Sequence, residues 1–439
     1  MDDLSAVPGG LSSRRWTRLI PLFGVCMFVL YVDRYNIALA APVIQQDLGL
    51  SNADIGTITG VFFLGSVIFQ IPLLASMARF GGKIVIAVSI FVWGLGASAS
   101  GLAQTHDQLV VARLVVGIGE AAFHPAMYVL IALWFMERER GRANSIFFSF
   151  NMVAGVVATP LTGLMLEHMS WHTVLVLQGL PAIVLAVVWL IVYNDRPSRV
   201  FWLAPGEGEL IEDAVAQEKK GRPSVASLGY RRALLNPTVL LLMLIYGLLG
   251  GVSGVFSMWL PTVIHATFRG LGPFAIGALA AAPALVGGLV AIALGRFADR
   301  TNRYRSTVAA TMLVGALGLA AGPLIAEPRW LQIVLLCVVA SGCVGVVPLF
   351  YASPTWMLPS AAVGVGIGLI NTTGALFGFA SSYLVGYLAD ALGSVPASFS
   401  LLALLLGLGA LLAAVVLRNP DSSVSVPQAP GSMAEIEDR

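Results

Sequence analysis

Five ionisable residues stand inside stretches that are otherwise apolar, and their side chains suit anion binding and proton transfer. Asp33 and Arg34 are neighbours in one such stretch, and Arg113, Glu120 and His124 share another. An arginine keeps its charge and offers a carboxylate a planar fork of N–H donors. A carboxyl group in apolar surroundings can carry a proton or release it. The set therefore suits coupled movement of an organic anion and a proton.

Helical spacing places the second group of residues on one face. Steps of four, three and four residues return to the same side of a helix. These steps separate Arg113, Gly117, Glu120 and His124. Because His124 is a lone histidine directly before Pro125, its pattern is more often that of a packing residue, and a role in substrate binding is the alternative.

The four charges also allow a purely structural interpretation. Adjacent residues on a helix point about 100° apart, so Asp33 and Arg34 can both face a cavity without pairing with each other. Either carboxylate could instead neutralise Arg34 or Arg113 and fix one helix against another. Charges inside a membrane are costly and are functional candidates by default, so pairing and function can coexist.

Composition indicates the class of protein in which these residues stand. The chain has 439 residues, of which 57% are hydrophobic and 11% charged, whereas soluble domains have about 25% charged residues. Its net charge of +2, without a basic stripe, excludes nucleic acid as a partner. Three cysteines lie in apolar stretches without CxxC spacing, and no hydrolase or metalloprotease motif occurs. We expect a membrane protein that is not an enzyme.

Twelve apolar runs are long enough to cross a bilayer, which takes about 20 helical residues. They begin near residues 19, 55, 84, 109, 143 and 173, and near 237, 273, 306, 331, 362 and 397. We therefore expect an all-α membrane protein with twelve transmembrane helices in two six-helix halves. Its predicted parts are residues 1–194 (first half), 195–235 (cytoplasmic linker), 236–418 (second half) and 419–439 (disordered cytoplasmic tail).

Lysine and arginine residues indicate the orientation, because cytoplasmic loops retain positive charge. With a cytoplasmic N-terminus, only Arg269 and Arg329 fall in loops on the other side, and only Arg34 and Arg113 fall within spans. Both chain ends are then cytoplasmic. A soluble helical bundle does not explain a charge asymmetry that alternates from loop to loop.

Two loops at corresponding places in the halves carry related motifs. They read Arg79-Phe80-Gly81-Gly82-Lys83 after the second span and Gly295-Arg296-Phe297-Ala298-Asp299-Arg300 after the eighth. Internal duplication of this kind is typical of transporters built from two repeats. In these loops the chain resembles the major facilitator superfamily, whose signature here is Gly-x-x-x-Asp-Arg. Simple positive-inside anchoring explains the basic residues as well, but it does not explain the paired glycine and aspartate.

That resemblance implies the major facilitator fold and a gating role for residues in both loops. In the first loop Ala78 stands where the family has its aspartate. The residues expected to act in gating are Arg79, Lys83, Gly295, Asp299 and Arg300.

A closer resemblance rests on four segments. They are Tyr31-Val32-Asp33-Arg34-Tyr35-Asn36-Ile37, Arg113 through Pro125, Trp259-Leu260-Pro261, and Gly368-Leu369-Ile370-Asn371-Thr372-Thr373-Gly374. Together they are similar to the anion:cation symporter family, over roughly residues 15 to 415. Known members include bacterial carriers of sugar acids, tartrate, phthalate and hydroxyphenylacetate, and animal vesicular carriers of anions.

This second resemblance implies proton-coupled symport of a carboxylate. It makes Asp33 and Glu120 the protonatable pair and Arg34 a substrate anchor. Arg113 is then a second anchor or a modulator of Glu120. His124 departs from the aromatic or apolar residue expected at its position, which points to a role in specificity.

Polar and aromatic residues within the spans complete the predicted site. Asn371 stands out, because a buried amide needs a partner that either the substrate or another helix can supply. The predicted substrate-binding residues are Tyr31, Arg34, Arg113, His124, Tyr351, Trp356, Asn371 and Thr372.

We predict a monomeric carrier in the bacterial inner membrane that takes up a small organic acid anion with protons by alternating access. No cofactor beyond the transported proton is expected. An exporter of drugs or metabolites from the same superfamily is the alternative, although two intramembrane arginines favour an anion. A non-transporting sensor is a third class. A sugar acid, an aromatic acid and a small dicarboxylic acid are all open as cargo.

Overall fold

The computed structural model describes residues 13–220, 234–325, 327–358 and 360–420, and within these ranges it contains helices and no strands. The first half consists of α1 (Arg14–Leu48), α2 (Asn52–Ser100), α3 (His106–Glu120), α4 (Phe123–Trp134), α5 (Glu137–His168) and α6 (Trp171–Val192). Between the halves lie η1 (Pro197–Arg199) and α7 (Glu207–Lys220). The second half consists of α9 (Pro237–Thr267), α10 (Pro273–Thr301), α11 (Tyr304–Ala321), η2 (Gly322–Leu324), α12 (Arg329–Cys343), α13 (Val347–Ala352), α14 (Pro354–Met357), α15 (Ser360–Leu392), α16 (Val395–Ser398) and α17 (Ser400–Val416). The predicted disordered tail, from residue 421 onward, lies outside the described residues.

Eleven helical runs in the described ranges are long and apolar enough to cross a membrane. One of them, α2, has 49 residues, and a straight helix of that length would extend about 74 Å, more than twice the thickness of a hydrocarbon core. It is in fact two helices joined at Gly81, whose φ of 80° and ψ of 156° are readily adopted only by glycine. The eleven runs thus provide twelve crossings, which confirms the predicted twelve-helix, all-α fold.

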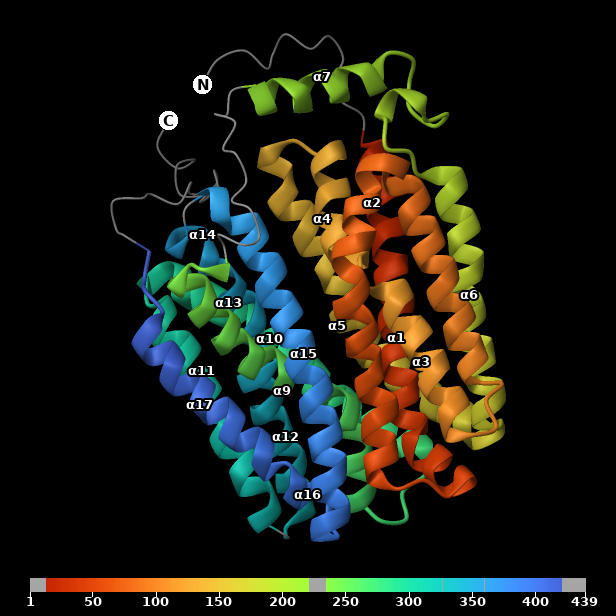
Figure 1. The fold of residues 1–439 in the computed structure, drawn as a ribbon, viewed down its shortest axis with the longest axis vertical. Coiled ribbons are helices and arrows are strands. Elements are labelled where there is room, and N and C mark those ends of the chain that lie inside the picture. Colours follow the sequence, from red (N-terminus) through yellow and green to blue (C-terminus); the bar gives the residue numbers. More distant parts are fainter. Residues whose placement is uncertain (1–12, 221–233, 326, 359, 421–439) are drawn as a thin grey trace, which may run out of the picture.

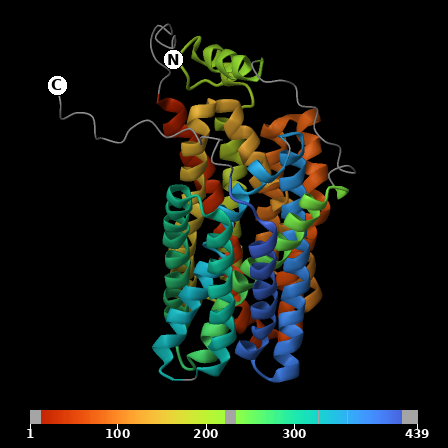
Figure 2. The same ribbon diagram turned by 90° about the vertical axis from the view of Figure 1, so that its left-hand side faces the viewer.

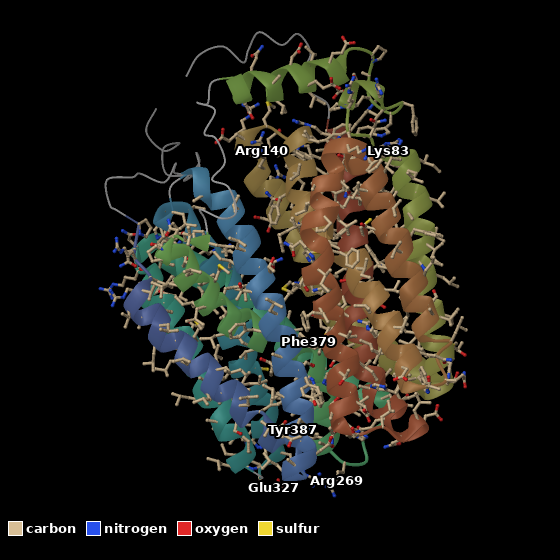
Figure 3. All side chains as sticks on the ribbon, viewed as in Figure 1. Lys83, Arg140, Arg269, Glu327, Phe379 and Tyr387 are labelled. Carbon is tan, nitrogen blue, oxygen red and sulfur yellow. The ribbon has the colours of Figure 1, made fainter. Side chains whose placement is uncertain are left out.

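The two halves stand side by side, and α7 lies across one end of the bundle (Figures 1 and 2). Lys83 and Arg140 lie at this end, whereas Arg269 and Glu327 lie at the opposite end (Figure 3). We call the first the linker end and the second the far end. The crowding of basic residues at the linker end agrees with its expected cytoplasmic location.

Close contacts between the halves occur at the far end. The ideal Cβ of an alanine at Gly277 of α10 would lie 2.2 Å from the carbonyl oxygen of Thr159 in α5. One at Gly386 of α15 would lie 2.3 Å from the carbonyl oxygen of Asn52 in α2. Small residues allow helix backbones to touch inside a membrane, so these glycines let the halves meet without intervening side chains.

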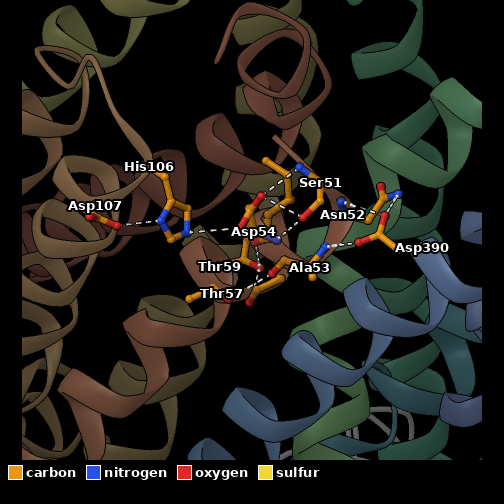
Figure 4. A network of polar contacts seen from close by, with 11 residues as sticks. Ser51, Asn52, Ala53, Asp54, Thr57, Thr59, His106, Asp107 and Asp390 are labelled. Carbon is orange, nitrogen blue, oxygen red and sulfur yellow. Dashed lines mark hydrogen bonds and ion pairs between the residues drawn. The ribbon is translucent and has the colours of Figure 1, made fainter. Parts of the chain in front are cut away.

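Two carboxylates strengthen the same end by capping helices of the other half. Oδ1 and Oδ2 of Asp390 in α15 accept hydrogen bonds from the backbone N–H groups of Asn52 (3.0 Å) and Ala53 (2.8 Å) (Figure 4). Oε1 of Glu167 in α5 accepts from the backbone N–H of Phe274 in α10 (3.2 Å). We call these two contacts the far-end caps. They are related by the duplication, because the fifth crossing caps the eighth and the eleventh caps the second.

Candidate functional site

The four intramembrane charges pair crosswise between α1 and α3. Nε and Nη2 of Arg34 lie 2.8 and 2.7 Å from Oε2 of Glu120. Nη1 of Arg113 lies 3.0 Å from Oδ2 of Asp33. Neighbours on α1 therefore bind residues two helical turns apart on α3. Both carboxylates therefore neutralise an arginine, as in the structural interpretation that the sequence left open.

The two pairs differ in accessibility. The side chain of Arg34 retains 23% of its exposed surface, whereas those of Glu120, Arg113 and Asp33 retain 0, 1 and 3%. Among the described residues, the buried Oε1 of Glu120 and Nε and Nη2 of Arg113 have no hydrogen-bond partner. Buried polar atoms of this kind are uncommon in folded proteins and costly to leave unpaired. Arg34 is thus the one member of the group that a solute can reach.

A break in the fourth crossing places Glu120 at a helix end. Helix α3 ends at Glu120 and α4 begins at Phe123. Pro125 explains the break, because proline lacks the N–H that would bond the carbonyl of Ala121, and its ring would clash with that carbonyl. The single helical stripe expected from Arg113 to His124 is therefore interrupted.

The ring of Phe62, on α2, lies beside both arginines. The guanidinium carbon of Arg34 lies 4.9 Å from the ring centroid of Phe62, and that of Arg113 lies 5.6 Å from it. Phe62 was not selected from the sequence, since a phenylalanine in an apolar run has the pattern of ordinary packing. Its place depends on Gly117, where an added Cβ would come within 2.1 Å of the Phe62 carbonyl oxygen.

Tyr31 and His124 border the accessible arginine. The ring centroid of Tyr31 is 5.1 Å from the guanidinium carbon of Arg34. Its hydroxyl lies 3.5 Å from Nε2 of His124, and the two rings meet edge to face at 5.9 Å. The structure therefore brings both predicted residues to the Arg34–Glu120 pair.

In the second half, Asn371 has partners in both halves of the molecule. Its Nδ2 donates to Oε1 of Gln70 in α2 (3.1 Å), and its Oδ1 accepts from the hydroxyl of Tyr351 (3.2 Å). Tyr351 in turn packs against Tyr246, with 4.8 Å between ring centroids. Gln70 was not selected from the sequence, although a buried amide in an apolar span was a usable signal.

Two other predicted residues form hydrogen bonds away from the charged group. The hydroxyl of Thr372 donates to the carbonyl of Gly368 in its own helix (3.0 Å). The indole of Trp356 donates to the carbonyl of Arg418 (2.9 Å), and its ring packs on Tyr304 at 4.8 Å. The structure therefore does not bring Trp356 together with the charged group, because its short helix α14 ends beside the last residues of the second half.

The predicted gating loops lie at the linker end, and each is held by contacts within its own half. The backbone N–H of Lys83 donates to both carboxylate oxygens of Asp195, at 3.0 and 3.1 Å. The hydroxyl of Tyr304 donates to Asp299. The guanidinium of Arg79 lies over the Phe80 ring, while Gly295 has open space beside its Cα and Arg300 is exposed. No hydrogen bond or ion pair joins the two loops among the residues that the structure describes.

Metal ligands do not gather in the described part of the chain, where no group of three or more histidine, cysteine, aspartate or glutamate side chains is placed to hold an ion. The polar groups that do meet inside the described spans are the two ion pairs between α1 and α3 and the Gln70–Asn371 hydrogen bond between α2 and α15.

Comparison with known proteins gives the chain a family. A family model described as Major Facilitator Superfamily matches residues 23–382. A protein of Agrobacterium vitis named for tartrate transport is 28% identical over 93% of this chain and 91% of its own length. One of Bacillus subtilis named for galactarate and D-glucarate transport is 29% identical over 90% of each chain. A quinolone resistance transporter of Acinetobacter baumannii is 27% identical over 91% of this chain and 93% of its own.

Among solved structures, a bacterial homologue of the human lysosomal transporter Spinster, in an inward-facing conformation, has the same fold. It superposes with a TM-score of 0.67 over 93% of this chain and 96% of its own, at 15% sequence identity.

Proposed function

Because the chain belongs to the major facilitator superfamily, we propose that it is a secondary transporter that takes up a small organic carboxylate together with protons. Family membership makes it a multi-pass membrane transporter and not an enzyme. One observation carries the finer proposal: Arg34 is the accessible member of a buried four-charge group, and its partner Glu120 can lose its charge by taking up a proton.

Charge balance links the anion to the proton. Two arginines and two carboxylates sum to zero, and an anion that binds Arg34 would leave one uncompensated negative charge in an apolar region. A proton on Glu120 restores neutrality and frees Arg34 from its partner. Each ligand therefore favours binding of the other, and this reciprocal coupling is what symport requires.

Asp33 provides a second protonatable group in the proposal. A dicarboxylate carries one more negative charge, and protonation of Asp33 would offset it while freeing Arg113 to act on the same substrate. With a monocarboxylate, the fully buried Asp33–Arg113 pair stays intact and fixes α1 against α3. Arg113 is thus a second anchor in the first case and the structural partner of Asp33 in the second.

The remaining proposed substrate contacts are those near this group. Tyr31 and His124 lie beside Arg34, and the Asn371–Tyr351 pair can offer an amide and a hydroxyl from the second half once the bond to Gln70 opens. Thr372 neighbours Asn371 on the same helix. We leave Trp356 out of the proposed site because its indole is engaged at the end of α14.

Alternating access fits the distribution of contacts between the halves. With the linker end in the cytoplasm, the far-end caps join the halves on the periplasmic side, whereas no hydrogen bond or ion pair joins the two linker-end loops among the described residues. We propose that this state is the one open toward the cytoplasm. We propose that rocking of the halves breaks these caps and brings the two linker-end loops together. Those loops contain the predicted gating residues Arg79, Lys83, Gly295, Asp299 and Arg300.

The proposed setting is a bacterial inner membrane, with the lipid bilayer around a monomer and the proton as the only coupling ion. The alternative is an exporter, and the 27% identity to a quinolone resistance transporter is the observation that favours it. An exporter of this type would select cationic or neutral lipophilic compounds.

A thermal-shift screen separates these functions, because a ligand that binds the folded state raises its apparent stability. We would compare tartrate, D-glucarate and benzoate with ciprofloxacin at pH 5.5 and 7.5. Stabilisation by tartrate, D-glucarate or benzoate that is lost in Arg34→Ala supports the symporter. Stabilisation by ciprofloxacin alone, unaffected by Arg34→Ala, would contradict it and support the exporter.

A further inference from the structure

One aromatic ring serves both ion pairs. Phe62 on α2 is 1% exposed, and its ring lies 4.9 Å from the guanidinium carbon of Arg34 and 5.6 Å from that of Arg113. Both distances are within the range in which a guanidinium is attracted to the face of an aromatic ring, and burial strengthens that attraction. Tyr31 reaches Arg34 alone, at 5.1 Å. Phe62 is therefore the ring that the two arginines share.

Two contacts hold the backbone of α2 against α3 at this ring. Gly117 of α3 lies midway between Arg113 and Glu120, and a Cβ there would lie 2.1 Å from the carbonyl oxygen of Phe62. One turn further along α2, the hydroxyl of Ser66 donates to the carbonyl of Gly117 (3.1 Å). The crossing of α2 and α3 is thus fixed at the level of the charged group, and with it the backbone position from which the Phe62 ring projects.

We propose that Phe62 is a positioning residue that keeps Arg34 in its binding orientation while its carboxylate partner is exchanged for the substrate anion. This inference rests on the proposed function, in which Glu120 takes up a proton and releases Arg34. At that step the guanidinium loses the charge that held Nε and Nη2. Without another support, its long side chain would gain rotamers, and ordering it again would weaken binding.

An aromatic ring suits this task better than a polar group. It attracts the cation through its face but accepts none of the five N–H donors of the guanidinium, so all of them stay available to a carboxylate. The shared ring also supports Arg113, which would need the same help if Asp33 were protonated. A leucine of similar size would fill the space without attracting either cation.

The test measures binding and uptake in the full-length protein as the ring of residue 62 is made progressively less electron-rich. Phenylalanine at this position is replaced by its mono-, di- and trifluorinated analogues, which keep the shape of the ring and weaken its attraction for a cation. The probe is whichever of tartrate, D-glucarate and benzoate stabilises the unmodified protein most. We expect the dissociation constant and the KM for uptake to rise with each fluorine, by about three- to tenfold at trifluorination. Maximal rate and thermal stability without ligand should change little.

Two further variants control for packing. Phe62→Leu should weaken binding at least as much as trifluorination. Phe23→Leu removes an equally buried ring of α1 that packs on Trp189 and Tyr193, so it should lower thermal stability and leave KM unchanged. A KM that stays constant across the fluorinated series, with Phe62→Leu behaving like Phe23→Leu, overturns the positioning role.

Arg34→Ala distinguishes failure of this inference from failure of the proposed function. If Arg34→Ala abolishes binding while fluorination has no effect, the anchor stands and the role of Phe62 is rejected. If the probe binds equally well without Arg34, or if no carboxylate binds the unmodified protein, the proposed function fails and this inference fails with it.

Discussion

Nε and Nη2 of Arg34 both bond a single oxygen of Glu120, Oε2, while the other oxygen, Oε1, is buried without a hydrogen-bond partner among the described residues. The guanidinium therefore approaches its carboxylate from one side and keeps part of its surface exposed. The Asp33–Arg113 pair is closed off by comparison. Two arginine–carboxylate pairs on the same helices thus differ in accessibility, and we propose different roles for them.

Arg34→Ala should abolish anion uptake. Loss of a hydrogen bond to a charged partner is worth about 1.5–3 kcal/mol, which weakens binding by about 10- to 150-fold. Because the substitution also leaves Glu120 buried and unpaired, Arg34→Ala/Glu120→Gln is measured beside it to separate loss of binding from loss of fold. Arg269→Ala, in a far-end loop, is the control. Uptake of tartrate or D-glucarate at the unmodified rate in Arg34→Ala would exclude the anchor role.

Glu120→Gln should separate exchange from accumulation. Glutamine keeps the shape of the side chain but cannot carry a proton between the two sides of the membrane. Counterflow of labelled substrate between equal pools should therefore continue, whereas accumulation driven by a pH gradient should fail. Loss of both activities in a protein that is still folded would instead favour a purely structural role for the pair.

Asp33→Asn should destabilise the protein more than it alters specificity. Removing one partner of a buried ion pair leaves the other charge uncompensated and costs about 3–5 kcal/mol. Asp33→Asn/Arg113→Met removes both charges, so it should recover most of the lost stability in a thermal unfolding measurement. If the double variant is as unstable as the single one, Asp33 stabilises the fold through something other than its ion pair with Arg113.

Asp390→Ala and Glu167→Ala should loosen the far end. Each removes a carboxylate that caps a helix of the other half, a contact worth about 1 kcal/mol, or about fivefold in the balance between closed and open states. A cysteine at Thr59, buried beside Ser382 of α15, reports opening in a background without the three native cysteines. An impermeant maleimide added from the far side should label it faster in both variants.

Asp54→Ala is the matched control for the far-end caps. Asp54 lies in the first turn of α2, the helix that Asp390 caps, but its carboxylate bonds Ser51 within its own half (Figure 4). Its removal should leave the labelling rate unchanged. Equal acceleration in Asp54→Ala and Asp390→Ala would mean that helix fraying, rather than separation of the halves, exposes the reporter.

The fold was predictable because membrane crossing needs long apolar runs. Those runs, and the basic loops that alternate with them, can be recognised directly in the sequence. Asp33, Arg34, Arg113 and Glu120 were predictable for the same reason, since charges stand out in apolar helices. Their crosswise pairing was not, because spacing along one helix does not give the rotation of its neighbour.

Three residues differ from the sequence-based prediction, each for its own reason. Phe62 has the chemistry of any packing residue, and only the close crossing at Gly117 makes it a support for two cations. Gln70 was a polar residue in a span and could have been selected. Trp356 was expected near the substrate, but the tenth crossing breaks into α12, α13 and α14, which places its indole beside Arg418.

If anion and proton move together through the Arg34–Glu120 pair, substrate entry must carry protons, and proton flux into proteoliposomes measures this. With a pH indicator inside and no imposed gradient, tartrate, D-glucarate or benzoate is added outside, whichever binds best. We predict that in the unmodified protein the anion acidifies the lumen as it enters. Glu120→Gln should carry substrate by exchange without acidification. Entry of the anion with no change in internal pH in the unmodified protein would contradict the claim.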